Sequence, residues 1–492
     1  MTKIYNYWHE KGIPYFKPIH FVVGNFGPCL LGKKSWLALT EEVYKKFPND
    51  RYVGFYEFTT PILIIRDPEL IKDITIKDFD SFPNHRRFVS SDIDPLWGKG
   101  LFQMSTREGW HSMRSTLSPF FTGSKLKMLF TLMGECATQF IDHIKSQNGE
   151  MIEIKDTYTR FSNDIIATCA FGIQCDSLKH RENEFYVMGR EASDFSGIRG
   201  LRFFIYDFSA TLMKIFDIKI FSNRVSAFFR KIIKEALVLR REKNIIRPDM
   251  LHLLIEAAKK INNLDYEERM KNVLNEFTDE DITAQVITFF IAGFETISTA
   301  LCYLTYYLAI NPDVQKRLYD EINETLEESP KTTYETLTSM KYLECVISES
   351  LRINTPVGIV NRRCEKPYTI KPVNPTEKPV ELNKGSIIWF PAGALQKDEK
   401  YFPNPDRFDP ERFNAENKSK INPFAYIPFG SGPRNCVGTR FATLEMKTII
   451  VEILKHFEIV PNAKTEIPLV PSPVHFNGLP DGGMWLDFKP RT

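Results

Sequence analysis

Residues 429–438 of this 492-residue chain read Phe-Gly-Ser-Gly-Pro-Arg-Asn-Cys-Val-Gly. They place Cys436 in a glycine-rich turn of basic character, just before a stretch with helical periodicity. Glycine allows close approach of the backbone and unusual dihedral angles. Exposed N–H groups at a helix start, together with a nearby guanidinium, favour the negative thiolate over the thiol. The ten residues therefore indicate a thiolate that is presented to a metal.

The surroundings of Cys436 in the sequence narrow the kind of metal. No other Cys or His lies beside it, whereas zinc sites and iron–sulfur clusters take several such ligands at short spacings. A single protein thiolate suits haem iron. A lone Cys near a helix start is more often a small buried hydrophobe. The fixed pattern of glycines and Arg434 around Cys436 argues against that alternative.

The same ten residues resemble the haem-binding loop of the cytochromes P-450, F-x-x-G-x-R-x-C-x-G. The resemblance implies that Cys436 is the axial ligand of haem b. Further family motifs occur in order from residue 110 to residue 438. The amino-acid sequences of residues 66–72 and 116–125 are most similar to those of insect detoxification members of the ninth and sixth families. These are related to the vertebrate third family. A mainly α-helical fold is implied, with smaller β-rich parts near the amino terminus and at about residues 360–390. We expect a single large domain over residues 21–492.

Composition excludes several other classes of protein. Lys and Arg number 64 and Asp and Glu 62, so the net charge of +2 argues against a general nucleic-acid binder. The eight cysteines lack the paired spacing of a disulfide framework or a zinc site, which favours a reducing compartment. No repeat or low-complexity tract appears.

The amino terminus has the features of a segment that follows a membrane anchor. It contains no apolar run of about 20 residues, the length a spanning helix needs, and no signal peptide. Residues 12–18, Gly-Ile-Pro-Tyr-Phe-Lys-Pro, resemble the proline-bearing hinge of microsomal family members. We therefore expect residues 1–20 to be this hinge and the anchor to have been removed. The native protein is expected at the cytoplasmic face of the endoplasmic reticulum membrane.

The longest helical pattern runs from about residue 278 to residue 310. Thr278 and Asp281 form an acidic variant of the capping box, and Asn311 followed by Pro312 ends the pattern. A helix of about 30 residues, at about 1.5 Å each, crosses a whole domain. The sequence therefore predicts a long, mostly buried central helix.

The centre of that helix resembles the family's oxygen-activation segment, A-G-x-E-T, which here ends in Glu295 and Thr296. Reduction of dioxygen consumes protons, so a carboxylate and a hydroxyl in a dry pocket suit a proton relay. Taken alone, this pair on a helix is more often exposed. In the context of residues 429–438, we expect Glu295 and Thr296 to be the catalytic pair.

Four side chains are expected to hold the haem propionates. The family uses W-x-x-x-R for this task, which corresponds to Trp110 and Arg114. Propionates are carboxylates, for which planar guanidinium forks are the expected partners. The resemblance therefore implies Arg434 and Arg362 as well, although Arg363 stands beside the latter.

A second polar set is expected to fix the fold. Glu349 and Arg352 lie at i and i+3 on one helix face, and Arg412 lies in Pro-Glu-Arg-Phe. Such a pattern is ordinarily a weak surface ion pair. Its order in the chain resembles the family's E-x-x-R and P-E-R-F elements, which implies a buried structural network.

Substrate-lining positions follow from the resemblance and from helical spacing. Phe289, Ala292 and Thr296 share one face at i, i+3 and i+7, and Val357 and Ile359 would supply another wall. Such pockets are apolar, which implies a lipophilic organic substrate. The alternative for each aromatic side chain is ordinary packing in the core.

Two further segments are expected to face the substrate, at about residues 88–102 and 196–221. Residues 201–208, with Phe216 and Phe221 beyond, are unusually aromatic. They either pack against the fold or dip into the membrane as a substrate entrance.

The chain carries no flavin or nicotinamide fingerprint, so NADPH is expected to act only through a partner reductase, with cytochrome b5 as a further partner. A basic docking face for an acidic partner would comprise Lys125, Lys127, Lys397, Lys400 and Arg440. The alternative is that these are ordinary solvated side chains. We expect a monomer at the membrane surface that binds no nucleic acid.

Three functions stay open at this point. The first is a haem-thiolate monooxygenase that uses O2 to oxidise xenobiotics such as insecticides or plant toxins. The second is an isomerase or dehydratase that acts on peroxides, against which the retained Glu295 and Thr296 speak. The third is a haem carrier or sensor without turnover.

Overall fold

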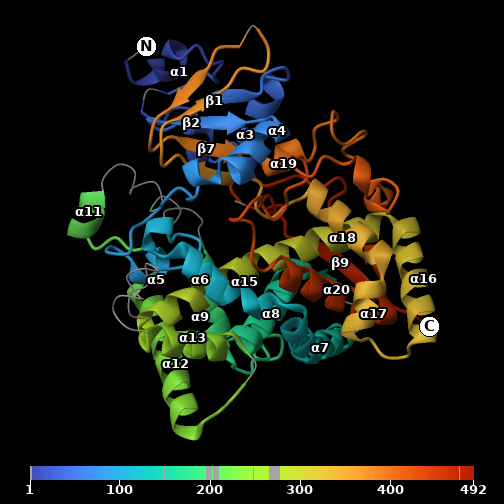
Figure 1. The fold of residues 1–492 in the computed structure, drawn as a ribbon. Helices are drawn as coiled ribbons and strands as arrows, with labels where there is room; N and C mark the ends of the chain where they lie inside the picture. The colour runs from blue at the N-terminus through green and yellow to red at the C-terminus, as the bar shows by residue number, and fades with distance from the viewer. Residues whose placement is uncertain are drawn as a thin grey trace. The chain divides into compact units, whose positions relative to one another are not determined.

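The structure is a computed structural model that describes residues 3–20, 22–147, 151–194, 202, 210–247, 249–264, 277–375, 377–475 and 477–491. The chain forms two compact units, each described here by itself (Figure 1). The first comprises Met1–Arg86, Ser348–Cys436 and Pro468–Gly482, and the second Arg87–Ile347, Val437–Ile467 and Gly483–Thr492. The predicted mainly helical fold with smaller β-rich parts is confirmed. The single domain expected over residues 21–492 stays a prediction.

The first unit is built on a four-stranded sheet of order β1-β2-β7-β4. The two β-rich parts expected separately join in it, because β2 pairs in parallel with β7 while the other neighbours are antiparallel. The amino-terminal segment packs onto β1, where Trp8 is buried and its Nε1 donates to the Phe55 carbonyl at 3.0 Å. The elements of this unit are α1 (Tyr7–Glu10), α2 (Gly27–Leu30), α3 (Trp36–Lys46), β1 (Tyr52–Glu57), β2 (Thr60–Ile65), α4 (Pro68–Lys72), β4 (Val360–Arg363), β5 (Tyr368–Ile370), β6 (Val380–Leu382), β7 (Ile387–Phe390) and α19 (Ala392–Leu395).

The second unit is a set of helices around α15 (Asp279–Ile310). The predicted capping box is present, since Thr278 Oγ1 accepts from Asp281 N at 3.2 Å and Asp281 Oδ2 accepts from Thr278 N at 2.8 Å. The other helices are α5 (Pro95–Gly98), α6 (Trp110–Leu117), α7 (Gly123–Ser146), α8 (Ile154–Ile166), α9 (Glu184–Ser193), α11 (Ala210–Ile215), α12 (Asn223–Lys243), α13 (Met250–Asn262), α16 (Pro312–Glu328), α17 (Tyr334–Ser339) and α20 (Thr439–His456). α18 (Lys341–Ile353) crosses the boundary between the units in the sequence.

α15 is the core helix of its unit. It is long and apolar enough to cross a membrane, yet 61% of its most apolar window is buried inside the protein. α8 packs along it, and both helices are drawn side by side in Figure 1. Burial on most sides explains the nearly continuous apolar sequence of α15.

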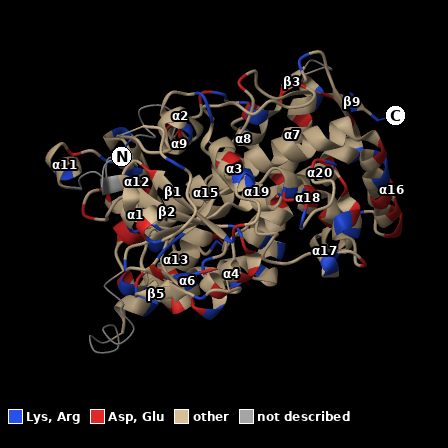
Figure 2. Cartoon of the chain, turned by 90° about the horizontal axis from the view of Figure 1, so that it is seen from above, with Lys and Arg blue, Asp and Glu red and all other residues tan. Residues whose placement is uncertain are grey.

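Sequence patterns did not predict the second sheet, of order β3-β9-β8, which consists of β3 (Ile152–Glu153), β8 (Phe457–Pro461) and β9 (Trp485–Pro490). β8 and β9 pair antiparallel although a long segment separates them, and such non-local pairing leaves no short-range turn signal. Lys and Arg are mixed with Asp and Glu along the ribbon (Figure 2), as the near-zero net charge predicts.

Candidate functional site

Residues 429–436 of the cysteine loop lie in the first unit, and Cys436 is exposed to solvent. All eight cysteines are free thiols, and Cys436 is the exposed one, whereas six are buried and Cys29 is intermediate. Its backbone N–H donates to the Phe429 carbonyl at 2.8 Å, which closes the loop on itself. The loop therefore holds a reactive side chain outward on a fixed backbone.

Glycine is required at position 432 for two independent reasons. Its φ is +71°, in the left-handed region, and a Cβ there would lie 2.0 Å from the Thr75 carbonyl oxygen. The neighbouring Ser431 hydroxyl lies 3.2 Å from the Thr75 hydroxyl. The cysteine loop is thus seated directly against the segment that follows α4.

Two predicted arginines, Arg434 in this loop and Arg362 beside it, are buried. Arg434 Nε donates to the Pro83 carbonyl at 2.7 Å, and its Nη2 donates to Asn84 Oδ1 at 3.0 Å. Arg362 is fully buried, and its Nη2 donates to the Ser431 carbonyl at 2.9 Å. Arg363, the alternative to Arg362, instead pairs with Glu365 at 2.9 Å.

Arg362 is a buried cation without a carboxylate among the described residues. Burial alone lowers the pKa of its guanidinium to about 9, and its Nε has no hydrogen-bond partner in the described part of the chain. His85 lies beside it, and burial together with the positive charges of Arg362 and Arg434 lowers the pKa of His85 well below its usual range. The imidazole is therefore neutral at pH 7, and the surroundings of the cysteine loop are electropositive.

These features fit a haem whose iron would take the Cys436 thiolate and whose propionates would meet the guanidinium groups. A carboxylate would offset the desolvated charge of Arg362. The chain therefore offers a soft anionic ligand and anion-binding groups within one unit. His85 was not identified from the sequence, because a single His carries no pattern; its position after Asn84 in the chain becomes informative only through the fold.

The second unit holds the other predicted cofactor residues. Trp110 and Arg114 both lie on α6, four residues apart and therefore on one face. Trp110 is buried and Arg114 half-buried. Their expected role toward propionates stays a prediction.

The predicted catalytic pair lies at the middle of α15. The stripe of Phe289, Ala292 and Thr296 is the least buried part of this stretch, and Ala292 is exposed. The Thr296 hydroxyl donates to the Ala292 carbonyl one turn earlier. Glu295 Oε1 lies 2.9 Å from Lys155 Nζ of α8. The face at Ala292 is thus open, and the carboxylate beside it is tied to a neighbouring helix.

Lys155 was not identified from the sequence, because no motif links it to a residue 140 positions away. Its ammonium also donates to Ser298 Oγ at 2.7 Å and to Thr299 Oγ1 at 3.3 Å, so it bridges α8 to a polar strip on α15. Glu153 caps α8 by accepting from Lys155 N at 3.2 Å and from Asp156 N at 2.7 Å. The helix end that carries Lys155 is therefore fixed.

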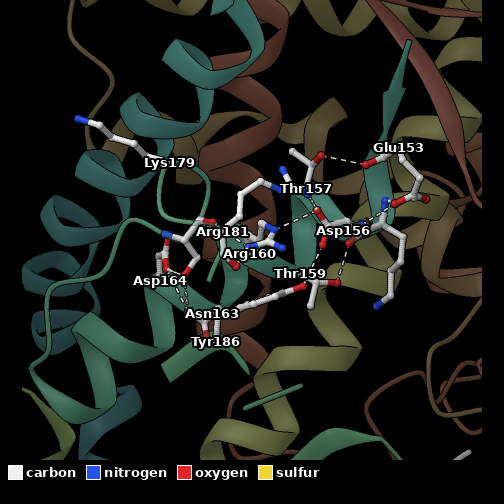
Figure 3. A network of polar contacts seen from close by, with 12 residues as sticks. Glu153, Asp156, Thr157, Thr159, Arg160, Asn163, Asp164, Lys179, Arg181 and Tyr186 are labelled. Carbon is white, nitrogen blue, oxygen red and sulfur yellow. Dashed lines mark hydrogen bonds and ion pairs between the residues drawn. The ribbon is translucent and has the colours of Figure 1, made fainter. Parts of the chain in front are cut away.

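α8 is held further by the polar network of Figure 3. Asp156 accepts from Arg160 Nε at 2.9 Å, from the Tyr186 hydroxyl at 3.0 Å and from Arg181. The pKa of Asp156 is lowered, because these donors outweigh burial, which by itself raises it. Figure 3 shows Asp156 and Arg160 projecting from the same face of α8 toward Arg181.

The predicted structural set of Glu349, Arg352 and Arg412 comes together in the first unit. Arg352 and Glu349 are fully buried and form two parallel bonds, Nε to Oε2 at 2.7 Å and Nη2 to Oε1 at 2.9 Å. Arg412 Nε lies 3.3 Å from Glu349 Oε1. Gln396 completes the set: its carbonyl accepts from Arg352 Nη1, and its side chain bonds Leu351 and Ile427 backbone groups.

The remaining predicted residues are only partly described. Val357 is exposed and Ile359 half-buried, and their role as substrate-lining residues stays a prediction. Phe216 is exposed, whereas Phe221 is buried. The aromatic segment 201–208 lies outside the described residues except for residue 202. Lys127 of the expected docking face pairs with Glu335 at 2.6 Å.

An exposed cysteine beside buried guanidinium groups, in a mainly helical fold with an acid–hydroxyl pair on its core helix, fits a haem-thiolate enzyme. The family model "Cytochrome P450" matches residues 14–484. The chain is 43% identical to "Cytochrome P450 9e2" of Blattella germanica, over 99% of this chain and 94% of that protein. It is 40% identical to "Probable cytochrome P450 9f2" of Drosophila melanogaster, over 99% and 95%, and 36% identical to "Cytochrome P450 6k1" of Blattella germanica, over 94% and 89%. The chain belongs to the cytochrome P450 family and is a haem-thiolate monooxygenase.

Proposed function

We propose that the protein uses NADPH and O2 to insert one oxygen atom into lipophilic small molecules, such as insecticides or plant toxins. The observation that carries this proposal is the exposed Cys436 thiol on a loop that contains the buried Arg434 and is contacted by the buried Arg362. Similarity to insect members of the ninth and sixth families supports the substrate class. When bound, haem b would supply the activation of dioxygen.

The residues of this chain have separate tasks in the proposal. Cys436 would hold the iron, and Arg434, Arg362, Trp110 and Arg114 would hold the propionates. Phe289, Ala292, Val357 and Ile359 would exclude water and shape the apolar pocket. These assignments rest on the family's motifs, together with the burial of Arg434, Arg362 and Trp110 and the exposure of Cys436.

Proton supply is assigned to Glu295 and Thr296. The Thr296 hydroxyl would pass a proton at the open face beside Ala292, and the Glu295 carboxyl would replenish it from its solvent-accessible position.

Electrons would come from a separate NADPH-dependent reductase, with cytochrome b5 as an accessory donor. Lys125, Lys397, Lys400 and Arg440 are the proposed docking residues; Lys127 already has an acidic partner in Glu335 and contributes less. We place the native protein at the cytoplasmic face of the endoplasmic reticulum membrane, as a monomer.

The first experiment replaces Cys436 by His in the haem-loaded protein. A neutral imidazole changes the ligand charge, so the carbon-monoxide spectrum of the reduced protein should lose its thiolate-type band, and product formation should fall to background. Activity that survives this change contradicts the proposal. Omission of NADPH or reductase separates the alternatives: a monooxygenase stops, whereas a peroxide isomerase continues.

A further inference from the structure

A buried carboxylate joins two segments of the second unit that are far apart in the sequence. Asp94, which is 1% exposed, caps α5 because its Oδ1 accepts from Trp97 N at 3.2 Å. Its Oδ2 accepts from the backbone N–H groups of Ile220 and Phe221, each at 3.1 Å. One side chain thus satisfies three backbone donors, two of them in the segment directly before α12.

Apolar contacts surround this carboxylate. Val89, Ile93 and Met213 form a buried cluster, against which Trp97, Ile218 and Ile220 pack. The rings of Trp97 and Phe221 lie 5.7 Å apart between centroids. Water is therefore kept from the Asp94 bonds, which strengthens them.

The loop that carries Asp94 is itself fixed to α15. Gln285 is fully buried; its Oε1 accepts from Leu101 N at 2.9 Å, and its Nε2 donates to the Lys99 carbonyl at 2.7 Å. Lys99 Nζ lies 2.8 Å from Asp281 Oδ1. Hydrogen bonds and an ion pair thus hold the loop of residues 88–102 against α15, and Asp94 in turn holds residues 220 and 221 against that loop.

We infer that Asp94 is a positioning residue that sets substrate size selectivity, by clamping residues 218–222 to the loop of residues 88–102. The inference rests on the proposed function and on the expectation from the sequence that the segments at about residues 88–102 and 196–221 face the substrate. With the clamp closed, the segments move together and admit bulky ligands slowly. Without it, residues 218–222 separate from the loop, and bulky ligands enter faster while small ones are unaffected.

Asp94→Asn tests the clamp, and Asp92→Asn is its matched control. Asp92 lies in the same loop and pairs with Lys214 of α11, the helix before residues 218–222, but both of those side chains are about half exposed. An amide at position 94 would turn an N–H group toward backbone donors, whereas loss of an exposed ion pair costs little.

The first measurement is hydrogen exchange, resolved to single residues by fragmentation mass spectrometry, on the haem-loaded protein. The Ile220 and Phe221 amides should exchange about tenfold faster or more in Asp94→Asn, and less than about twofold faster in Asp92→Asn. Equal exchange in the two variants overturns the inference. If Asp94→Asn does not fold, hydrogen exchange in the wild type alone tests the inference. The Ile220 and Phe221 amides must then exchange at least about tenfold more slowly than the Lys219 amide.

The second measurement follows binding of imidazole and of 4-phenylimidazole by the haem absorption band. Asp94→Asn should raise the association rate of 4-phenylimidazole by about threefold or more and leave that of imidazole within about twofold. Faster exchange with unchanged size selectivity overturns the inference. Failure of the proposed function would show differently, since product formation by the wild type would then not depend on NADPH and reductase, while the exchange and ligand-binding results stand independently.

Discussion

Lys155 Nζ lies 2.9 Å from Glu295 Oε1, and it also donates to the Ser298 hydroxyl at 2.7 Å. The lysine belongs to the first turn of α8, which Glu153 caps. Asp156, the residue after Lys155, accepts a hydrogen bond from Arg160. The orientation of the carboxylate that we assign to proton supply is therefore set by a neighbouring helix, and not by α15 alone.

Replacing Lys155 by Met should uncouple electron use from product formation. The Glu295 carboxylate would lose the charge that orients it, so we expect product per NADPH to fall by about three- to tenfold, less than the loss for a missing general acid. Product, hydrogen peroxide and NADPH are measured in parallel. Both side chains are partly exposed, so unfolding free energy should change by less than about 1 kcal/mol.

Lys155→Arg is the matched control, because it keeps the positive charge and the reach to Glu295. It should retain most of the coupling. Equal product per NADPH in the Met variant and the wild type would rule out a role for Lys155 in orienting Glu295.

Gly432→Ala should disrupt haem binding far more than Gly430→Ala. Both glycines have positive φ, +71° and +75°, so the added backbone strain, about 1 kcal/mol, is the same. Only at position 432 would the new Cβ lie 2.0 Å from the Thr75 carbonyl; at 430 its nearest neighbour is 3.8 Å away. The cysteine loop must then shift away from Thr75.

The measurement is the fraction of purified protein that carries haem, with the carbon-monoxide spectrum of the reduced form. We expect Gly430→Ala to stay near the wild-type fraction and Gly432→Ala to lose most of it. Similar haem-loaded fractions in the two variants would contradict the close contact between Gly432 and the Thr75 carbonyl.

Arg362→Met should have opposite effects on haem affinity and on the haem-free protein. The guanidinium is fully buried without a carboxylate among the described residues, so its removal should leave the haem-free protein as stable or more stable. Loss of a charged partner for a propionate should weaken haem binding by about 2 kcal/mol or more.

Haem titration and urea unfolding of the haem-free protein measure the two effects. Arg363→Met is the control, since Arg363 is more exposed and already paired with Glu365. It should change haem affinity by less than about 1 kcal/mol. Equal loss of affinity in the two variants would remove Arg362 from the proposed propionate site.

The sequence predicted those features whose cause is local. Thr278 and Asp281 define the start of α15 because a capping box is formed by residues three apart, and the glycines around Cys436 define its loop for a similar reason. Family motifs also predicted a buried pair of Glu349 and Arg352, and the structure contains this pair with two parallel hydrogen bonds.

Residues that act through distant contacts could not be found in this way. Lys155 reaches Glu295 only because α8 packs along α15, and Asp94 reaches Phe221 across more than a hundred residues. The pKa of His85 is lowered first by burial and then by the charges of Arg362 and Arg434, which are likewise remote in the chain. Side chains of this kind have no spacing rule, so only the tertiary fold identifies them.

Glu445 of α20 provides a last prediction, on the pH dependence of stability. It is fully buried, and neither carboxyl oxygen has a hydrogen-bond partner among the described residues. Burial raises its pKa well above the usual 4.5, and the facing Ser162 hydroxyl offsets this only in part. The folded protein therefore holds Glu445 protonated where the unfolded chain ionises it.

Proton linkage gives the direction in which Glu445 changes the unfolding free energy with pH. Between the unfolded pKa of about 4.5 and the higher folded value, the native state binds the extra proton, so this group lowers the unfolding free energy as pH rises, by up to about 1.4 kcal/mol per pH unit. Glu445→Gln removes the titration. The variant should therefore gain stability over the wild type from pH 5 to pH 8 in urea unfolding. Glu452→Gln, on the same helix but paired with Lys455 at 3.0 Å, should show no such gain. Parallel pH curves for the wild type and Glu445→Gln would mean that the buried carboxyl is ionised in the folded protein.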